Sequence, residues 1–332
     1  MTAAPPLLSV EDLFVSFHTR DGVARVINGV SLQVDAGESL AILGESGSGK
    51  SVTAQAIMGI LDVPPARIDG GRILYQGRDL LAIDERERRA VRGAGIAMVF
   101  QDALSALNPV FPVGWQIAES LRVHEGLSKP EAHERAVRLM ERVRIPAARA
   151  RARDYPHQFS GGMRQRVMIA MALALNPRVL IADEPTTALD VTVQAQIMDL
   201  LAELQHDTGM ALILITHDLG VVASVADRIA VMYAGRIVEH GDVHAIYERP
   251  AHPYTRALIE SIPRYGRSRG GPLRAIEGLP PSLTRIPPGC PFHPRCPVRQ
   301  DICSAEVPPD IELGERRVSA CHFAREVLNG RL

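Results

Sequence analysis

The segment Gly44–Ser51 constrains the fold of this chain most, because it reads Gly-Glu-Ser-Gly-Ser-Gly-Lys-Ser. The spacing fits the pattern G-x-x-x-x-G-K-[ST], in which backbone N–H groups and a lysine surround the phosphates of a nucleotide. Such a loop needs a strand before it and a helix after it, so that the positive helix end faces the anion. The apolar run Ser39–Leu43 precedes the loop, and a helix is expected from Lys50. The sequence therefore predicts a nucleoside triphosphate site.

Individual residues of this loop have separate expected roles. Lys50 supplies a point charge to the β- and γ-phosphates, and Ser51 is a candidate Mg²⁺ ligand. The glycines permit a strained turn and a close approach to the phosphates. The predicted ATP-binding residues here are Gly44, Glu45, Ser46, Gly47, Ser48, Gly49, Lys50, Ser51 and Val52.

Two adjacent carboxylates, Asp183 and Glu184, follow the apolar run Val179–Ala182. A buried strand of a parallel sheet delivers its C-terminal residues to the edge where open α/β sheets bind ligands. We expect Asp183 to hold Mg²⁺ and Glu184 to orient and polarise the attacking water.

Strand and helix patterns alternate along the chain, which predicts an α/β fold with a mostly parallel sheet covered by helices. Further strands are expected at Gly71–Gly77, Ile96–Phe100 and Ala211–Thr216. The stretch from Asn108 to about Arg153 has helical periodicity and reads as a helical insertion.

The overall composition excludes several classes of protein. Lys plus Arg is 37 and Asp plus Glu is 38, so the chain lacks the basic excess expected of a nucleic-acid binder. No apolar run approaches the ~18–20 residues needed to cross a bilayer. The N-terminus lacks the features of a signal peptide, and the expected location is cytoplasmic.

The segment Ser160-Gly161-Gly162 opens an apolar helix upstream of Asp183 and forms a second candidate anion site. Together with the phosphate loop, it makes the chain resemble the ATP-binding subunit of an ABC transporter. The resemblance extends from Leu7 to about Tyr247, and it departs from the common signature at the neighbours of the serine and glycines, which are Phe159 and Met163.

This resemblance implies a P-loop NTPase (RecA-like) ABC cassette with a helical subdomain and a C-terminal Cys/Pro-rich extension. It assigns Gln101 to the Q-loop, where it would bind Mg²⁺ or water, and His217 to γ-phosphate contact. Ala188-Leu189-Asp190 matches the D-loop, and Phe17 is the aromatic residue nearest the expected adenine position. The implied domains are 1–107 (core, first part), 108–165 (helical), 166–250 (core, second part) and 251–332 (extension).

All four cysteines, Cys290, Cys296, Cys303 and Cys321, lie in the proline-rich C-terminal segment. Disulfides are disfavoured in a reducing cytoplasm, and four unrelated buried thiols fit poorly with this confinement. The remaining explanation for the four cysteines is a metal centre. The thiols would hold either an iron–sulfur cluster or zinc, although their spacings are wide for zinc. His293 and His322 are alternative ligands.

The extension also resembles that of dipeptide and oligopeptide importer ATPases, through Gly289–Pro297, His252–Thr255 and Phe159–Val167. In that family the full cysteine set is associated with a 4Fe-4S cluster. The resemblance implies an energy-coupling ATPase that pairs with a second ABC ATPase subunit, as a heterodimer, and with two transmembrane permease subunits. A solute-binding protein would act indirectly, and the chain would be peripheral on the cytoplasmic face of the inner membrane.

Three other readings stay open at this point. The chain could be a soluble ABC ATPase acting on ribosomes or DNA, although it lacks a second cassette, a long coiled coil and a basic excess. It could energise an exporter, which the extension argues against. It could also serve a nickel- or glutathione-type importer, because the sequence does not name the cargo.

Overall fold

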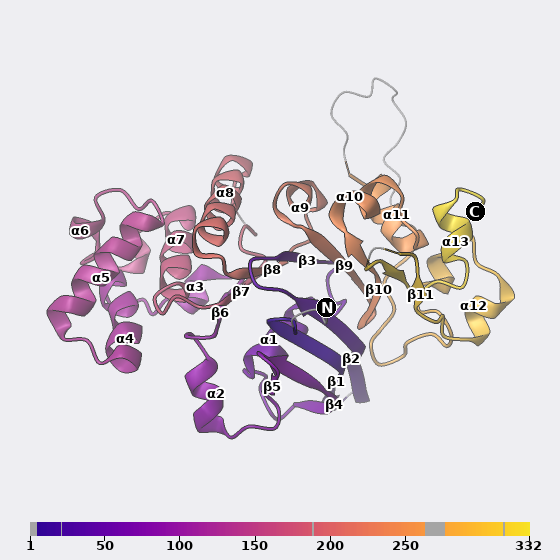
Figure 1. Cartoon of the computed structure of the whole chain (residues 1–332), viewed down its shortest axis with the longest axis horizontal. Coiled ribbons are helices and arrows are strands. Elements are labelled where there is room, and N and C mark those ends of the chain that lie inside the picture. Colours follow the sequence, from indigo (N-terminus) through magenta and orange to yellow (C-terminus); the bar gives the residue numbers. More distant parts are fainter. Residues whose placement is uncertain (1–4, 21, 188, 263–275, 315) are drawn as a thin grey trace. The chain divides into compact units, whose positions relative to one another are not determined.

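The computed structural model of the protein describes residues 5–20, 22–187, 189–262, 276–314 and 316–332. The chain divides into two compact units. Their helices and strands are labelled in Figure 1. The first comprises residues 1–34, 39–81 and 216–332, and the second comprises 35–38 and 82–215.

The first unit contains an antiparallel sheet in the order β2-β1-β4-β5. Its inward positions are apolar and fully buried, as at Leu8, Val10 and Leu13 of β1. The strands are β1 (Leu8–Thr19), β2 (Gly22–Val34), β4 (Ala66–Tyr75) and β5 (Arg78–Asp79).

A second set of strands in the first unit has the order β11-β12-β10-β9-β3. The strands β3 and β9 are parallel, while β9, β10, β12 and β11 pair antiparallel in turn. Every residue of β3 is buried, as its apolar sequence requires. The bounds are β3 (Ser39–Leu43), β9 (Arg228–Tyr233), β10 (Arg236–Asp242), β11 (Ile311–Glu312) and β12 (Val318–Ser319).

The helices of the first unit are short, and three of those described, α9, α10 and α11, have an N-terminal side-chain cap. Asp218, Asp242 and His252 each accept a hydrogen bond from a backbone N–H in the first turn of the helix that follows. The helices are α1 (Lys50–Met58), α9 (Leu219–Val225), α10 (Val243–Glu248), α11 (Pro253–Glu260), η2 (His293–Arg295), α12 (Asp301–Ala305) and α13 (Ala324–Leu328).

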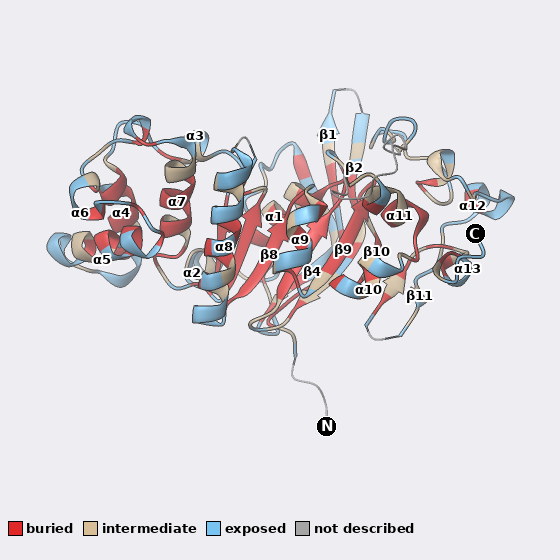
Figure 2. Cartoon of the chain, turned by 90° about the horizontal axis from the view of Figure 1, so that it is seen from above, coloured by how far each residue is buried: buried red, intermediate tan, exposed pale blue. Residues whose placement is uncertain are grey.

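The second unit contains three parallel strands in the order β8-β7-β6. They are β6 (Ile96–Val99), β7 (Val179–Asp183) and β8 (Ala211–Ile215), and every residue in them is buried. The helix α8 (Val191–Thr208) buries a stripe that includes Ile197, Leu201 and Leu204, while its opposite face is exposed (Figure 2).

The remaining helices of the second unit include a cluster in which α4, α5 and α7 pack against one another. Local sequence explains where α5 begins, because Ser128 and Glu131 form a reciprocal capping box. The bounds are α2 (Glu85–Val91), α3 (Ala103–Ala106), α4 (Val113–Glu125), α5 (Lys129–Arg142), α6 (Ala148–Arg151), η1 (Pro156–Gln158) and α7 (Gly161–Ala172).

These elements confirm the α/β class, the helix beginning at Lys50 and the helical insertion after Asn108. The expectation of a mostly parallel sheet was incomplete, because alternation of strands and helices does not reveal the antiparallel sheet of the first unit. The strand expected at Gly71–Gly77 begins earlier, at Ala66. Among the described residues, no helix combines the length and apolarity that a bilayer crossing demands.

Candidate active site

The phosphate loop connects β3 to α1 in the first unit, as the sequence predicts. Gly44, Gly47 and Gly49 have φ values of 154°, 78° and 107°, which side-chain-bearing residues rarely adopt. At Gly44 a Cβ atom would also lie 2.2 Å from the carbonyl oxygen of Met232. The glycines are therefore required by the turn and by its close contact with β9.

Lys50 is buried and folds back over the loop. Its Nζ donates hydrogen bonds to the carbonyl oxygens of Gly44, at 2.8 Å, and Glu45, at 3.1 Å. The ammonium group thus lies against the backbone of the loop, next to Gly44 and Glu45. Ser51 and Val52 follow in the first turn of α1.

In the second unit, the ends of β6 and β7 bring Gln101 and Glu184 together. The Gln101 Nε2 donates to Glu184 Oε2 at 2.9 Å, and the Thr187 Oγ1 donates to the same oxygen at 2.8 Å. Glu184 has a positive φ of 45° and its N–H donates to the Ile215 carbonyl. This uncommon backbone conformation directs the carboxylate beside Gln101, and such strain is typical of functional sites.

Asp183 ends β7 and is buried, whereas Glu184 is half-buried. Neighbouring residues thus place one carboxylate at the buried end of β7 and the other against Gln101. Thr187 was missed by the sequence reasoning. Its spacing of three residues after Glu184, within one turn, is the signal that would have indicated it.

The signature segment begins α7, and Ser160 is the N-cap, accepting a hydrogen bond from the Met163 N–H at 3.3 Å. Gly162 contacts the start of α8 so closely that a Cβ would lie 2.5 Å from Val193 Cγ1. Asp190 caps α8 through the Val193 N–H. The signature and the Asp190 turn therefore pack together, while Ala188 of the expected D-loop lies outside the described residues.

His217 lies in the first unit, exposed, in the turn before α9. The neighbouring Asp218 caps that helix by accepting from the Gly220 N–H at 2.8 Å. Phe17, the candidate adenine-stacking residue, is half-buried in β1.

The four cysteines are free thiols that line one small cavity together with Phe292, Phe323 and three histidines, His252, His293 and His322. Burial raises the pKa of Cys290 to about 11 and that of Cys321 to about 12. Within the part of the chain that the structure describes, no three His, Cys, Asp or Glu side chains are arranged to hold a metal ion as they stand. Any bound metal would have to draw the thiols inward and displace their protons.

Comparison with known proteins adds independent observations. Residues 27–187 match the profile of the ABC transporter family, and residues 238–303 match that of the oligopeptide/dipeptide transporter C-terminal region. The chain is 51% identical to the oligopeptide transport ATP-binding protein OppD of Salmonella typhimurium, covering 95% of this chain and 93% of that protein. It is also 51% identical to the dipeptide transport ATP-binding protein DppD of Bacillus subtilis, with coverages of 91% and 90%.

Among solved structures, a dimeric ATP-binding cassette in a post-hydrolysis state with ADP and phosphate aligns with a TM-score of 0.64 and 27% identity. The alignment covers 71% of this chain and 98% of that one. Fold and site together define an ATP-hydrolysing ABC cassette. More narrowly, the chain belongs to the family of oligopeptide and dipeptide transport ATP-binding proteins, which are energy-coupling subunits.

Proposed function

We propose that this chain hydrolyses ATP to drive the import of dipeptides or oligopeptides. The observation that carries the proposal is the buried Lys50 within an intact phosphate loop, found in a chain whose C-terminal region matches peptide transporters. The cargo follows from the names of the relatives, so it is tested by peptide uptake in cells that lack the chain. Uptake of nickel or glutathione alone would replace the peptide assignment.

The proposed nucleotide chemistry divides among a few residues. Lys50 and the N–H groups of the loop would hold the β- and γ-phosphates, and His217 would contact the γ-phosphate. Ser51, Gln101 and Asp183 would hold Mg²⁺, which neutralises developing charge on the phosphate oxygens. Glu184 would accept the proton of the attacking water, with its carboxylate oriented by Gln101 and Thr187.

The signature supports a two-subunit site. Ser160 and Gly161 are exposed at the N-terminal end of a twelve-residue helix, where backbone N–H groups favour an anion. We propose that Ser160, Gly161, Gly162 and Asp190 complete the nucleotide site of a second ABC ATPase subunit in a head-to-tail heterodimer. Two permease subunits would anchor the pair to the cytoplasmic face of the membrane, and a solute-binding protein would deliver the cargo. Co-purification of these subunits tests the assembly, and a stable homodimer active on its own would contradict it.

The four cysteines are proposed to hold a 4Fe-4S cluster, with zinc as the alternative. The four free thiols line one cavity, and thiolates ligate both groups, but the thiols would have to move closer together to hold either one. Anaerobically purified protein should contain about four irons per chain with matching sulfide. Stoichiometric zinc without iron would contradict the cluster, and loss of metal in a Cys303→Ser variant would support the assigned ligands.

Replacing Glu184 by Gln tests the catalytic assignment. The amide keeps the size of the side chain but cannot accept the proton, so turnover should fall by about 10²–10⁴-fold while ATP binding is retained. Steady-state phosphate release and equilibrium nucleotide binding measure the two effects on the assembled transporter. The Glu203→Gln variant, an exposed change on α8, is the matched control. Normal hydrolysis by Glu184→Gln would contradict the assignment of Glu184 as the general base.

A further inference from the structure

The C-terminal extension contacts the phosphate loop directly, through Arg295. This residue lies between Cys290 and Cys296 in the sequence. Its guanidinium forms a bidentate salt bridge with the carboxylate of Glu45, 250 positions earlier. The distances are 2.6 Å from Nη1 to Oε2 and 3.0 Å from Nη2 to Oε1. The side chains of Arg295 and Glu45 are 6% and 26% exposed, so solvent screens this pair less than it screens a surface pair.

Other contacts fix the guanidinium in place. Its Nε donates to the Glu277 carbonyl oxygen at 3.0 Å, and Nη1 lies 3.4 Å from the Tyr233 hydroxyl. The guanidinium carbon is also 5.9 Å from the centre of the Tyr233 ring. The Arg295 guanidinium is therefore held in the orientation that a bidentate salt bridge with Glu45 requires. Arginine–carboxylate pairs are strong in this geometry.

Glu45 is held at its backbone as well. Its N–H donates to the hydroxyl oxygen of Tyr254 at 2.9 Å, and its carbonyl oxygen accepts from Lys50 Nζ at 3.1 Å. Thus the N–H, the carbonyl and the carboxylate of one loop residue each have a partner. Two of those partners, Tyr254 and Arg295, belong to the C-terminal part of the chain.

An aromatic cluster connects these contacts to the cysteine loop. Tyr233, Tyr254 and Phe292 are fully buried, with ring centroids 4.6 to 5.3 Å apart. Cys290 and Cys296 pack against the same cluster. The two cysteines flank both Phe292 and Arg295 in the sequence, so the cysteine loop and the guanidinium pack on the same aromatic cluster.

We propose that Arg295 is a positioning residue for nucleotide binding, which holds the phosphate loop in its binding shape through Glu45. In this proposal the extension acts on the nucleotide site through the Arg295–Glu45 ion pair, and it does not contact the nucleotide itself. Without the ion pair, the Glu45 carboxylate loses its partner Arg295 and only the backbone of Glu45 stays held. The phosphate loop around Lys50 then loses part of its preorganisation. The proposal rests on the nucleotide role proposed above for the phosphate loop.

Arg295→Ala, Arg295→Lys and Glu45→Gln, made in the full chain, test the proposal. Equilibrium binding of a fluorescent ATP analogue should weaken about tenfold for Arg295→Ala, since each tenfold change corresponds to about 1.4 kcal/mol. Arg295→Lys keeps the charge but loses the bidentate geometry, and about threefold weakening is expected. In hydrolysis assays KM for ATP should rise by the same factors, while kcat changes less than about twofold.

A double variant separates this role from general destabilisation. Glu45→Gln combined with Arg295→Ala should bind the analogue no more weakly than Arg295→Ala alone, because both changes remove one interaction. Arg325→Ala, an exposed change in α13, is the control and should bind like the unmodified chain. If Arg295→Ala does not fold, Arg295→Lys and Glu45→Gln carry the test.

Unchanged affinity in folded Arg295→Lys and Glu45→Gln would overturn the inference, and so would fully additive losses in the double variant. A loss confined to kcat would also contradict a positioning role in binding. Failure of the unmodified chain to bind the analogue would instead refute the nucleotide role of the loop itself, which keeps the two proposals distinguishable.

Discussion

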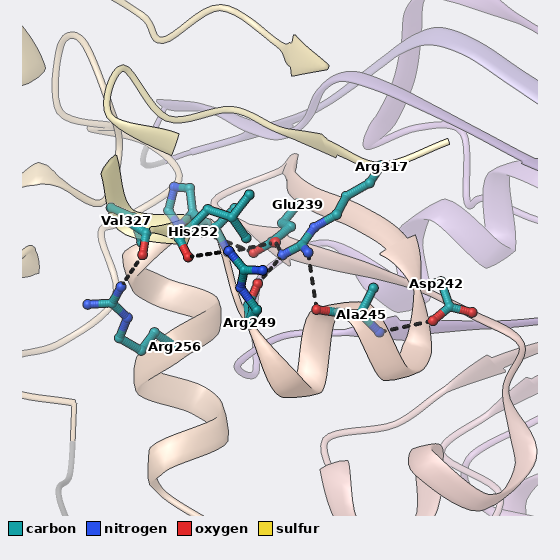
Figure 3. Close-up of polar contacts among 10 residues, drawn as sticks. Glu239, Asp242, Ala245, Arg249, His252, Arg256, Arg317 and Val327 are labelled. Atoms are coloured by element: carbon teal, nitrogen blue, oxygen red, sulfur yellow. Dashed lines mark hydrogen bonds and ion pairs between the residues drawn. The ribbon is translucent and has the colours of Figure 1, made fainter. Parts of the chain in front are cut away.

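Glu239 of β10 is a buried carboxylate whose partners all come from the C-terminal part of the chain. Its oxygens accept from the N–H groups of Ala251 and His252 and from Arg317 Nη2, the last at 2.8 Å (Figure 3). The Arg317 guanidinium also donates to the carbonyl oxygens of Ala245 and Arg249. Arg317 therefore joins β10, α10 and the segment leading into β12.

Arg317→Ala should destabilise the chain by about 3–5 kcal/mol, because it leaves the buried Glu239 charge without its cation. Urea unfolding followed by circular dichroism measures the change. The control is Arg149→Ala, which removes an exposed pair with Glu134 and should shift the unfolding midpoint little. A small loss of stability in Arg317→Ala would show that the two backbone N–H donors are enough to stabilise the buried Glu239 carboxylate.

At the scale of elements, the contact between α7 and α8 depends on a residue without a side chain. Gly162 lies in the first turn of α7, and the Val193 side chain fills the space that a Cβ would take. In an exposed helix interior, Gly→Ala would be stabilising by about 1 kcal/mol. Here the crowding reverses that expectation, because Val193 is β-branched and has little freedom to move away.

Gly162→Ala should therefore lower stability by about 1–3 kcal/mol and reduce ATP turnover, since it displaces the signature from Asp190. Thermal unfolding and phosphate release check both effects. Adding Val193→Ala should restore much of the stability by reopening the space. Equal losses in the single and double variants would locate the cause elsewhere than in this contact.

The element scale also shows what sequence patterns could and could not predict. The buried apolar runs that precede Gln101 and Glu184 were recognisable, because each is short, continuous and followed by a polar residue. The pairing of β12 with β10 was not, since β12 has only two residues, too few for a periodic pattern. The register of so short a strand depends on the surrounding packing.

For the molecule as a whole, the C-terminal region is structurally part of the first unit. It adds β12 and β11 to the sheet beyond β10, and Arg256 donates to the carbonyl oxygens of Val327 and Leu332. Together with the pairs of Arg317 and Arg295, these contacts connect the cysteine cavity to the phosphate loop within one compact unit.

Removing the proposed metal should therefore weaken nucleotide binding. If the cysteine loop relaxes without its metal, Arg295 loses its fixed place, and affinity for the ATP analogue should fall about as far as in Arg295→Ala. Titration of metal-depleted and reconstituted protein measures this. The Arg295→Ala variant should respond little to metal removal, and an equal response in both proteins would contradict the coupling.

Local sequence patterns account for the chemistry of the nucleotide site. The phosphate loop, the Asp183-Glu184 pair and the signature are short segments, and spacing within a few residues dictates their turns and helix starts. Tertiary structure alone decided which distant residues support them. Glu45 meets Arg295 because strand pairing and an aromatic core return the C-terminal region to the phosphate loop, and contacts at such separation leave no periodic trace in a single sequence.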